Sequence, residues 1–346
     1  MKPSLDDLKR ITEKMLAEES SYLDLRNACG SLLDFFYQVS EFDDTDPVNG
    51  QHMQSQAGQA VSPEAAAVCI RDFMRTCVFL RGIKEAISTK LQSNPDMAVT
   101  VLYAGTGPFA TLLIPLVTLF SPAQLNMLLL DINPASIAYL SRIIRNFNLE
   151  PYILQVVETD AVTYRIPEQW KPDIILSETM MPSLKTEPQV SIVANLVGQC
   201  PQVLLVPEMI EVSAVLYNNK QTAGKRFINL ETLLVFTKEA ALKMAAEQQT
   251  GDTVFPVTIL EVQKPAEPGY SRLALLTRIR VFNEHFLNYS ESILTIPVFV
   301  YNMHSIKTWP AVLNIQYRIF PIPGFTISKD GLTLFEVKKK EIPIIN

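Results

Sequence analysis

The sequence contains little of the material from which metal sites and disulfide frameworks are built. Only four cysteines stand among 346 residues, none in a Cys-x-x-Cys spacing, and the three histidines are scattered along the chain. We therefore expect no zinc or other metal site, no disulfide framework and a reducing compartment.

Long apolar runs and an excess of positive charge are also missing. The most apolar run, residues 111–120, is too short to span a bilayer and contains Pro115, and no apolar stretch follows the first ten residues. Thirty basic residues against thirty-six acidic ones give a formal charge of −6. This balance argues against a nucleic-acid-binding surface and is compatible with a small cationic substrate. We expect a soluble, cytoplasmic protein with neither a membrane nor a nucleic-acid partner.

The amino-terminal part of the chain shows helical periodicity with one interruption. Apolar residues at helical spacing predict helices within residues 4–40. The polar stretch that follows contains Pro47 and Gly50 and predicts a linker or a mobile loop. Another helical segment is expected over residues 62–90, because a serine cap precedes a proline at the first turn.

From residue 98 the pattern changes to short apolar strands that alternate with helices, one of them expected at residues 108–120. Such alternation predicts a doubly wound parallel sheet that is covered on both faces. Beyond Pro207, strands follow one another with a single helix between them, near residues 237–248, which predicts an antiparallel sandwich or barrel. The predicted organisation is a helical segment with its linker, a nucleoside-binding α/β domain and a β-barrel or β-sandwich substrate domain, at residues 1–60, 61–206 and 207–346.

Candidate binding residues follow the predicted parallel strands. The first strand leads into "YAGTGPFA", where Gly105 and Gly107 allow a sharp turn and a close approach of a ligand to the backbone. The second strand ends in Asp131, whose carboxylate can accept both hydroxyls of a ribose, and the third is followed by Asp160, which could take an adenine amino group. Ligands of open parallel sheets bind beyond the carboxyl ends of the strands, so these residues predict a nucleoside site. The alternative is that the glycines serve only as turns and the acids only as helix caps.

A nicotinamide dinucleotide is a second possible ligand of the same fold. Gly105, Gly107 and Ala110 satisfy the glycine part of its G-x-G-x-x-G/A fingerprint. That fingerprint, however, places the acid about 20 residues further on, whereas Asp131 lies twenty-six residues after Gly105. The residues outside this motif decide between the two ligands.

The segment "SETMMPSLKTE", residues 177–187, contains two glutamates, Glu178 and Glu187, nine residues apart. Neither helical nor strand periodicity makes residues at that separation neighbours. They can meet only if the loop folds back around something positive. The alternative is a pair of solvated surface carboxylates, which is the common state of glutamate.

Together these motifs resemble the class I S-adenosylmethionine-dependent methyltransferases, and among them the protein arginine methyltransferases. "VLYAGTGPFA", "LLLDINP" and "PDIILSETM" resemble the family's first motif, its acidic motif and the strand that leads into its double-glutamate loop. The two glutamates of that loop grip the substrate guanidinium, which implies this role for Glu178 and Glu187. "DFMRTCVFLRGI" resembles the helix over the cofactor, whose arginine, followed by threonine, binds the methionyl carboxylate; here these are Arg75 and Thr76. The resemblance thus implies S-adenosyl-L-methionine as the cofactor and a Rossmann-like domain followed by a β-barrel.

The sequence also departs from that family. The Thr-His-Trp loop is absent, because "TWP" at residues 308–310 lacks the histidine, and neither the tyrosine-rich helix nor the dimerisation arm has a clear equivalent. In these departures the sequence is similar to the free-L-arginine methyltransferases of natural-product pathways. We expect an N-methyltransferase that acts on free L-arginine or a small arginine derivative. Protein arginine methylation and an inactive scaffold of the same fold are the alternatives. A homodimer is expected, assembled through residues 1–60, because the added apolar helices must be covered.

Overall fold

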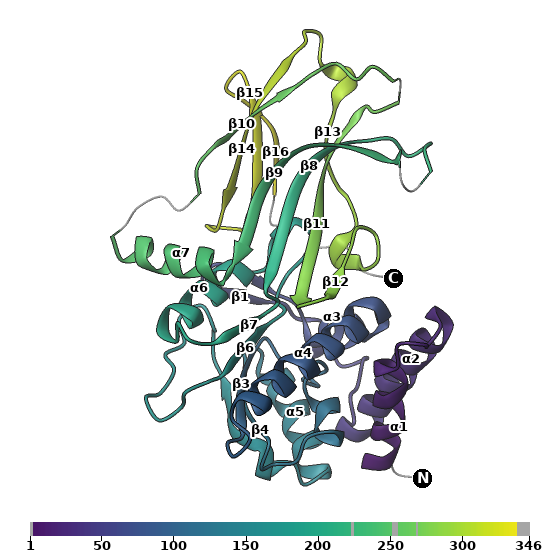
Figure 1. Ribbon diagram of the computed structural model, residues 1–346, viewed down its shortest axis with the longest axis vertical. Helices are drawn as coiled ribbons and strands as arrows, with labels where there is room; N and C mark the ends of the chain where they lie inside the picture. Colours follow the sequence, from purple (N-terminus) through teal and green to yellow (C-terminus); the bar gives the residue numbers. More distant parts are fainter. Residues whose placement is uncertain (1–2, 223–224, 251–254, 268, 338–346) are drawn as a thin grey trace.

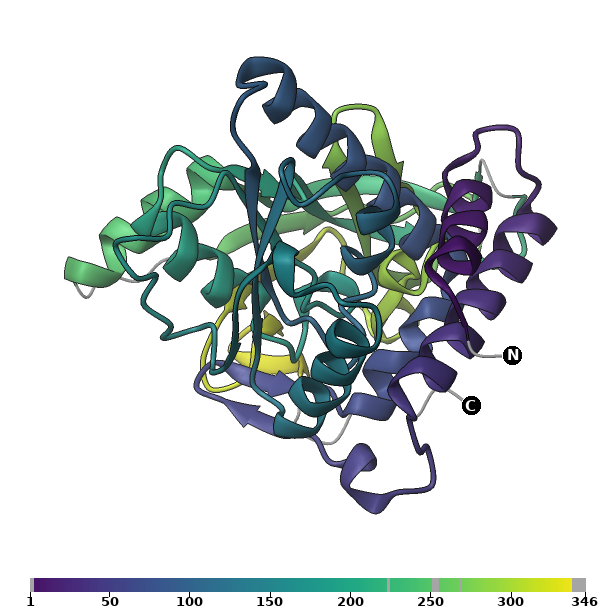
Figure 2. The same cartoon turned by 90° about the horizontal axis from the view of Figure 1, so that it is seen from below.

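The computed structural model describes residues 3–222, 225–250, 255–267 and 269–337. The described chain has two halves along its longest axis, one with a parallel sheet and most of the helices and one with antiparallel sheets (Figure 1). Figure 2, the view from below, shows the amino-terminal helices on one side of the molecule and the green helix α7 on the opposite side.

A five-stranded parallel sheet forms the centre of the first half, in the order β5-β4-β3-β6-β7. Its strands are Val99–Ala104 (β3), Leu125–Asp131 (β4), Ile153–Glu158 (β5), Ile174–Ser177 (β6) and Leu204–Val206 (β7). The central strands are buried almost throughout, as expected for a sheet covered on both faces. The strand order reverses between β3 and β6, so the switch point of the sheet lies there.

Helices α4, α5 and α6 pack against this sheet. The helices of this half are Pro63–Val68 (α3), Phe73–Ser93 (α4), Pro134–Asn146 (α5) and Gln189–Gln199 (α6), with short 3₁₀ turns at Cys69–Arg71 (η2), Ile114–Thr118 (η3), Glu150–Tyr152 (η4) and Pro182–Leu184 (η5). The segment 62–90 is therefore helical, as predicted, with a break before Phe73. Helix α6 was not predicted from the sequence.

The helix expected at residues 108–120 is wrong. The chain there forms successive turns, with one 3₁₀ helix, η3. Pro108 and Pro115 have no N–H to donate to a helix, and Ala110 has a φ of 43°, which leaves the right-handed helical region. The side chains of this segment are nevertheless almost all buried, which explains its apolar composition.

Two capped helices, Leu5–Leu16 (α1) and Tyr22–Ser40 (α2), open the described chain. Ser4 and Ser21 each close a capping box with an aspartate three residues on. α1 packs on η3, and α2 packs on α5, η2 and α4. The Phe36 ring is fully buried and stacks on the ring of Phe109, next to the glycine turn. The apolar faces of both helices are thus covered by the same chain.

The polar stretch after α2 differs from the linker or mobile loop that we expected. It forms a 3₁₀ turn, Pro47–Gly50 (η1), and an antiparallel hairpin of Met53–Ser55 (β1) and Gly58–Ala60 (β2). The side chains and backbone of this hairpin are bonded to residues far along the sequence, which periodicity does not show.

The second half contains two antiparallel sheets, in the orders β12-β11-β8-β9, with β13 also on β11, and β10-β14-β15-β16. The strands are Met209–Tyr217 (β8), Phe227–Thr237 (β9), Thr258–Val262 (β10), Arg272–Phe282 (β11), His285–Leu287 (β12), Val298–Asn302 (β13), Ala311–Arg318 (β14), Gly324–Lys329 (β15) and Leu332–Glu336 (β16). The helical elements are Lys238–Thr250 (α7), Ile293–Thr295 (η7) and Met303–Ser305 (η8). The predicted fold class, a Rossmann-like domain followed by an antiparallel β domain, is confirmed.

Candidate functional site

The glycine turn after β3 lies at the switch point of the sheet. Gly105 has a φ of 78°, and a Cβ at this position would lie 2.2 Å from Cγ2 of Thr179, just after β6. A side chain here would collide with the neighbouring strand end, so the turn needs glycine for both conformation and space. The turn thereby packs directly against the residue that follows Glu178.

Asp131, at the end of β4, lies beside this turn as predicted. One of its carboxylate oxygens accepts the backbone N–H of Gly107 at 2.7 Å and the other accepts that of Asn133 at 2.8 Å. Burial raises the pKa of Asp131 to about 6, although these two N–H donors favour the ionised form. The Ile132 N–H and the Thr106 hydroxyl also favour the ionised carboxylate, so a ligand hydroxyl bound there would share its oxygens with these donors.

Asp160, after β5, contacts the amino-terminal hairpin. One oxygen accepts the backbone N–H of Val162 at 3.0 Å, and the other accepts both the Ser55 hydroxyl and the backbone N–H of Gln56, each at 2.9 Å. Asp160, the predicted ligand of an adenine amino group, therefore lies at the carboxyl edge of the sheet. Its bonds to Ser55 and Gln56 also hold the hairpin there.

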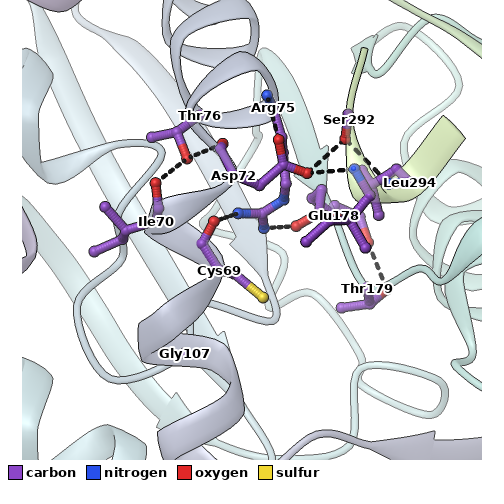
Figure 3. A network of polar contacts seen from close by, with 12 residues as sticks. Cys69, Ile70, Asp72, Arg75, Thr76, Gly107, Glu178, Thr179, Ser292 and Leu294 are labelled. Atoms are coloured by element: carbon purple, nitrogen blue, oxygen red, sulfur yellow. Dashed lines mark hydrogen bonds and ion pairs between the residues drawn. The ribbon is translucent and has the colours of Figure 1, made fainter. Parts of the chain in front are cut away.

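Arg75 reaches the same edge from the first turn of α4. The Asp72 carboxylate caps this helix by accepting the backbone N–H of Arg75 at 3.1 Å. The guanidinium forms an ion pair with Glu178 and donates to the carbonyl oxygen of Cys69 at 3.4 Å (Figure 3). Arg75 and Glu178, 103 positions apart in the sequence, are thus direct neighbours, and both side chains are buried.

Asp72 also connects the site to the β half of the chain. Its second oxygen accepts the Ser292 hydroxyl and the backbone N–H of Ile293, both at 2.7 Å (Figure 3). The start of α4, the helix that carries Arg75, is therefore bonded to the start of η7. Sequence reasoning missed this residue, since an aspartate before a helix indicates a cap and nothing about its second oxygen.

Gln189, at the start of α6, holds the strand end that carries Glu178. Its amide oxygen accepts the backbone N–H of Thr179 at 2.9 Å and the hydroxyls of Thr179 and Ser177, and its amide nitrogen donates to the carbonyl of Ser177 at 2.9 Å. The residues on both sides of Glu178 are fixed in this way. Gln189 was not predicted either, because no local pattern identifies a buried glutamine.

The two-glutamate loop, residues 178–187, is held by the β half. The backbone N–H of Ser183 donates to the Thr277 hydroxyl at 2.8 Å, and the Tyr317 hydroxyl donates to the carbonyl of Leu184 at 2.9 Å. Ser183, Leu184 and Thr186 all have positive φ, which makes the loop turn back on itself. This path leaves both glutamates only 8% exposed and therefore excludes the solvated-surface alternative.

Glu187 differs from Glu178 in its surroundings. Within the part of the chain that the structure describes, its carboxylate forms no hydrogen bond or ion pair. Burial raises the pKa of Glu187 to about 7, and the Arg75 charge opposes this shift only in part. A buried carboxylate without a partner is costly, so Glu187 is a candidate for binding a cation.

No group of three or more metal-ligating side chains that could hold an ion occurs among the described residues. Nor does any described helix combine the length and the apolar character needed to cross a membrane.

Comparison with known proteins finds similarity to solved structures. No protein-family model matches the chain, and no curated protein does. One chain of the Trypanosoma brucei PRMT1 enzyme-prozyme heterotetrameric complex with AdoHcy is similar at 14% identity and a TM-score of 0.50, over 78% of this chain and 92% of that one. A PRMT6–SAH structure has 9% identity and a TM-score of 0.49, over 72% and 96% of the two chains. Arabidopsis thaliana protein arginine methyltransferase 10 has 10% identity and a TM-score of 0.41, over 74% and 92%. At this identity, the similarity to the first of them concerns the fold alone.

Proposed function

We propose that this protein is an S-adenosylmethionine-dependent N-methyltransferase that acts on the guanidino group of arginine, with free L-arginine or a small arginine derivative favoured over protein. The observation that carries the proposal is the pair of buried glutamates, one bound to Arg75 and the other with no side-chain partner among the residues that the structure describes. The similarity to the Trypanosoma brucei PRMT1 complex, which was solved with AdoHcy, supports the same reaction class.

A guanidinium suits this pair of carboxylates. It stays protonated, with a pKa above about 12, and its planar donors match carboxylate oxygens two at a time. Glu187 can accept two of these donors. Glu178, which is paired with Arg75 and flanked by residues bonded to Gln189, presents a fixed second acceptor. The negative charge of Glu187 would then gain the partner that it lacks.

The glutamates would also offset a repulsion. S-adenosylmethionine, when bound, supplies an electrophilic methyl group on a positively charged sulfur. Two unit charges 4 Å apart at an effective dielectric of 20 repel by about 4 kcal/mol, so a cationic acceptor needs negative charge around it. The ionised Glu187 carboxylate would also take the proton from the reacting nitrogen as the methyl group is transferred.

The residues at the sheet edge fit the methyl donor. Gly105 and Gly107 leave two positions of the turn after β3 without a side chain, the Asp131 carboxylate would accept ribose hydroxyls, and Asp160 would accept an adenine amino group. Arg75 would hold the methionyl carboxylate while it remains paired with Glu178. Because Arg75 would then contact both the methionyl carboxylate of the methyl donor and Glu178 of the acceptor site, it would link the two sites.

Calorimetry and mass spectrometry test the proposal. The purified protein should bind S-adenosylhomocysteine and, in its presence, L-arginine; with the methyl donor it should add 14 Da per methyl group to free arginine. Citrulline has no planar cation and should not be methylated. Absence of S-adenosylhomocysteine binding would contradict the cofactor, and equal methylation of citrulline would contradict the role of the glutamates.

Methylation of arginine-containing peptides instead of free arginine would favour the protein-methyltransferase alternative, and cofactor binding without any transfer would favour the scaffold. The homodimer and the cytoplasmic location stay predictions.

A further inference from the structure

The hairpin β1–β2 touches three parts of the molecule that lie far apart in the sequence. At its turn, the Ser55 hydroxyl and the Gln56 N–H donate to Asp160. The Gln54 side-chain amide donates to the carbonyl of Gly58 at 2.6 Å and keeps the turn closed. The hairpin tip is therefore a fixed structure at the carboxyl edge of the parallel sheet.

Strand β2 of the hairpin lies along the two-glutamate loop. The backbone N–H of Gln59 donates to the carbonyl of Thr186 at 2.9 Å, and the N–H of Thr186 donates to the carbonyl of Pro323, also at 2.9 Å. Both backbone groups of the residue before Glu187 are thus bonded, one to the hairpin and the other to the β half. No polar backbone group of Thr186 remains free to pair with an added strand.

Gly58 shows how closely these segments meet. It has a φ of 131°, and a Cβ at this position would lie 2.5 Å from the carbonyl oxygen of Thr186 and 3.0 Å from Cδ of Pro323. The next residue towards the turn, Ala57, is fully buried. At Gly58 the hairpin therefore packs against both the two-glutamate loop and the β half, next to Glu187.

We propose that the hairpin, residues 53–60, makes the acceptor site selective for a free guanidine compound such as L-arginine and excludes arginine within a polypeptide. The inference rests on the proposed function. An arginine inside a polypeptide carries main chain on both sides, and enzymes commonly bind such chains by pairing with exposed backbone groups. Here the backbone beside Glu187 is already paired on both edges and covered, whereas free arginine needs space only for one side chain and its termini.

Gly58→Ala tests the inference, because the added methyl group must push the hairpin away from Thr186 and Pro323. Gly331→Ala is the matched control. Gly331 also has a positive φ, 78°, but a Cβ there would meet nothing within 4 Å. Backbone strain is common to both substitutions, so a difference between them reports the displaced hairpin.

The measurement is calorimetric titration of each protein, saturated with S-adenosylhomocysteine, with L-arginine and with a short peptide that carries a central arginine. We expect the parent and Gly331→Ala to prefer free arginine by at least about thirtyfold in Kd. Gly58→Ala should lose at least tenfold of that preference. If Gly58→Ala does not fold, Ser55→Ala, which removes one of the two hairpin bonds to Asp160, should shift the preference in the same direction.

The outcomes separate this inference from the proposed function. A parent that binds the peptide as tightly as free arginine, or hairpin variants that keep the full preference, would overturn the role of the hairpin and leave arginine methylation intact. A parent that binds neither compound would refute the proposed function and, with it, this inference.

Discussion

Replacing Glu187 by glutamine should make the ligand-free protein more stable and at the same time nearly inactive. Glutamine keeps the size of the side chain and removes its charge. In the ligand-free protein this charge is buried without a hydrogen-bond or ion-pair partner among the described residues, so it costs stability. With the guanidinium bound, the same charge should be needed.

The size of the stability effect follows from the pKa. Burial raises the pKa of Glu187 from 4.5 to about 7. Because one pKa unit corresponds to about 1.36 kcal/mol, the buried charge costs about 3 kcal/mol once it is fully ionised. With an unfolding entropy of roughly 2.1 cal/mol/K per residue, this is a shift of about 4 °C in Tm for a chain of 346 residues.

The sign of the pH dependence is fixed by the direction of the shift. The folded protein holds the Glu187 proton more tightly than the unfolded chain does, so this contribution to stability is fully present below pH 4.5 and is lost as the pH rises through about 7. Glu187→Gln does not titrate. Its Tm should therefore exceed that of the parent above pH 7, and the difference should disappear towards pH 4.

The assay is thermal unfolding of the ligand-free parent, Glu187→Gln and Glu150→Gln between pH 4 and 8.5. Glu150 is exposed, so its replacement should follow the parent at every pH. Turnover of arginine by Glu187→Gln should fall at least about thirtyfold, the equivalent of about 2 kcal/mol for removal of one partner of a buried charge pair. A Glu187→Gln protein with the stability profile and the turnover of the parent would refute the reasoning.

Three further predictions concern the cofactor side and the amino-terminal helices. Arg75→Ala should weaken S-adenosylhomocysteine binding by a few kcal/mol in calorimetry, and unchanged affinity would contradict the assignment of Arg75 to the cofactor. The same substitution should lower the unfolding free energy by about 3–5 kcal/mol, because it leaves Glu178 buried without its cation. The affinity of the parent for S-adenosylhomocysteine should fall as the pH drops through about 6, where Asp131 takes up a proton. Asp131→Asn should bind S-adenosylhomocysteine weakly and show no fall in affinity near pH 6. The same fall in the variant would assign this pH dependence to another group. A chain without residues 1–60 should be insoluble or monomeric, because it lacks core side chains such as Phe36, and a soluble dimer in light scattering would be the opposite result.

Much of the cofactor side could be predicted from the sequence, because the features involved are local. Buried strands of a parallel sheet have continuous apolar sequences, and their carboxyl ends meet at one edge whatever the loops do. Gly105 follows β3 directly, Asp131 is the last residue of β4 and Asp160 lies two residues after β5, so their place at that edge could be derived from position alone. The error at residues 108–120 has the same origin: an apolar run indicates burial, but burial does not specify a helix when prolines remove the donors.

The acceptor side was decided by tertiary structure. A nine-residue separation in the sequence does not bring Glu178 and Glu187 together; the loop turns back because Thr277, Tyr317 and Pro323 of the β half bind its backbone. The hairpin at residues 53–60 is polar and reads as a linker, since its bonding partners lie more than 100 positions away.

By itself, then, the sequence determined which strands form the parallel sheet, which edge of it carries the candidate ligand-binding residues and which side chains these are. Periodicity shows which face of its own strand or helix each residue lies on. Only the folded chain decided that Arg75 pairs with Glu178 and that Glu187 is buried with no ion-pair partner of its own in the described part of the chain. Contacts of this kind depend on where distant segments pack, and the cost of burying a charge depends on everything that surrounds it.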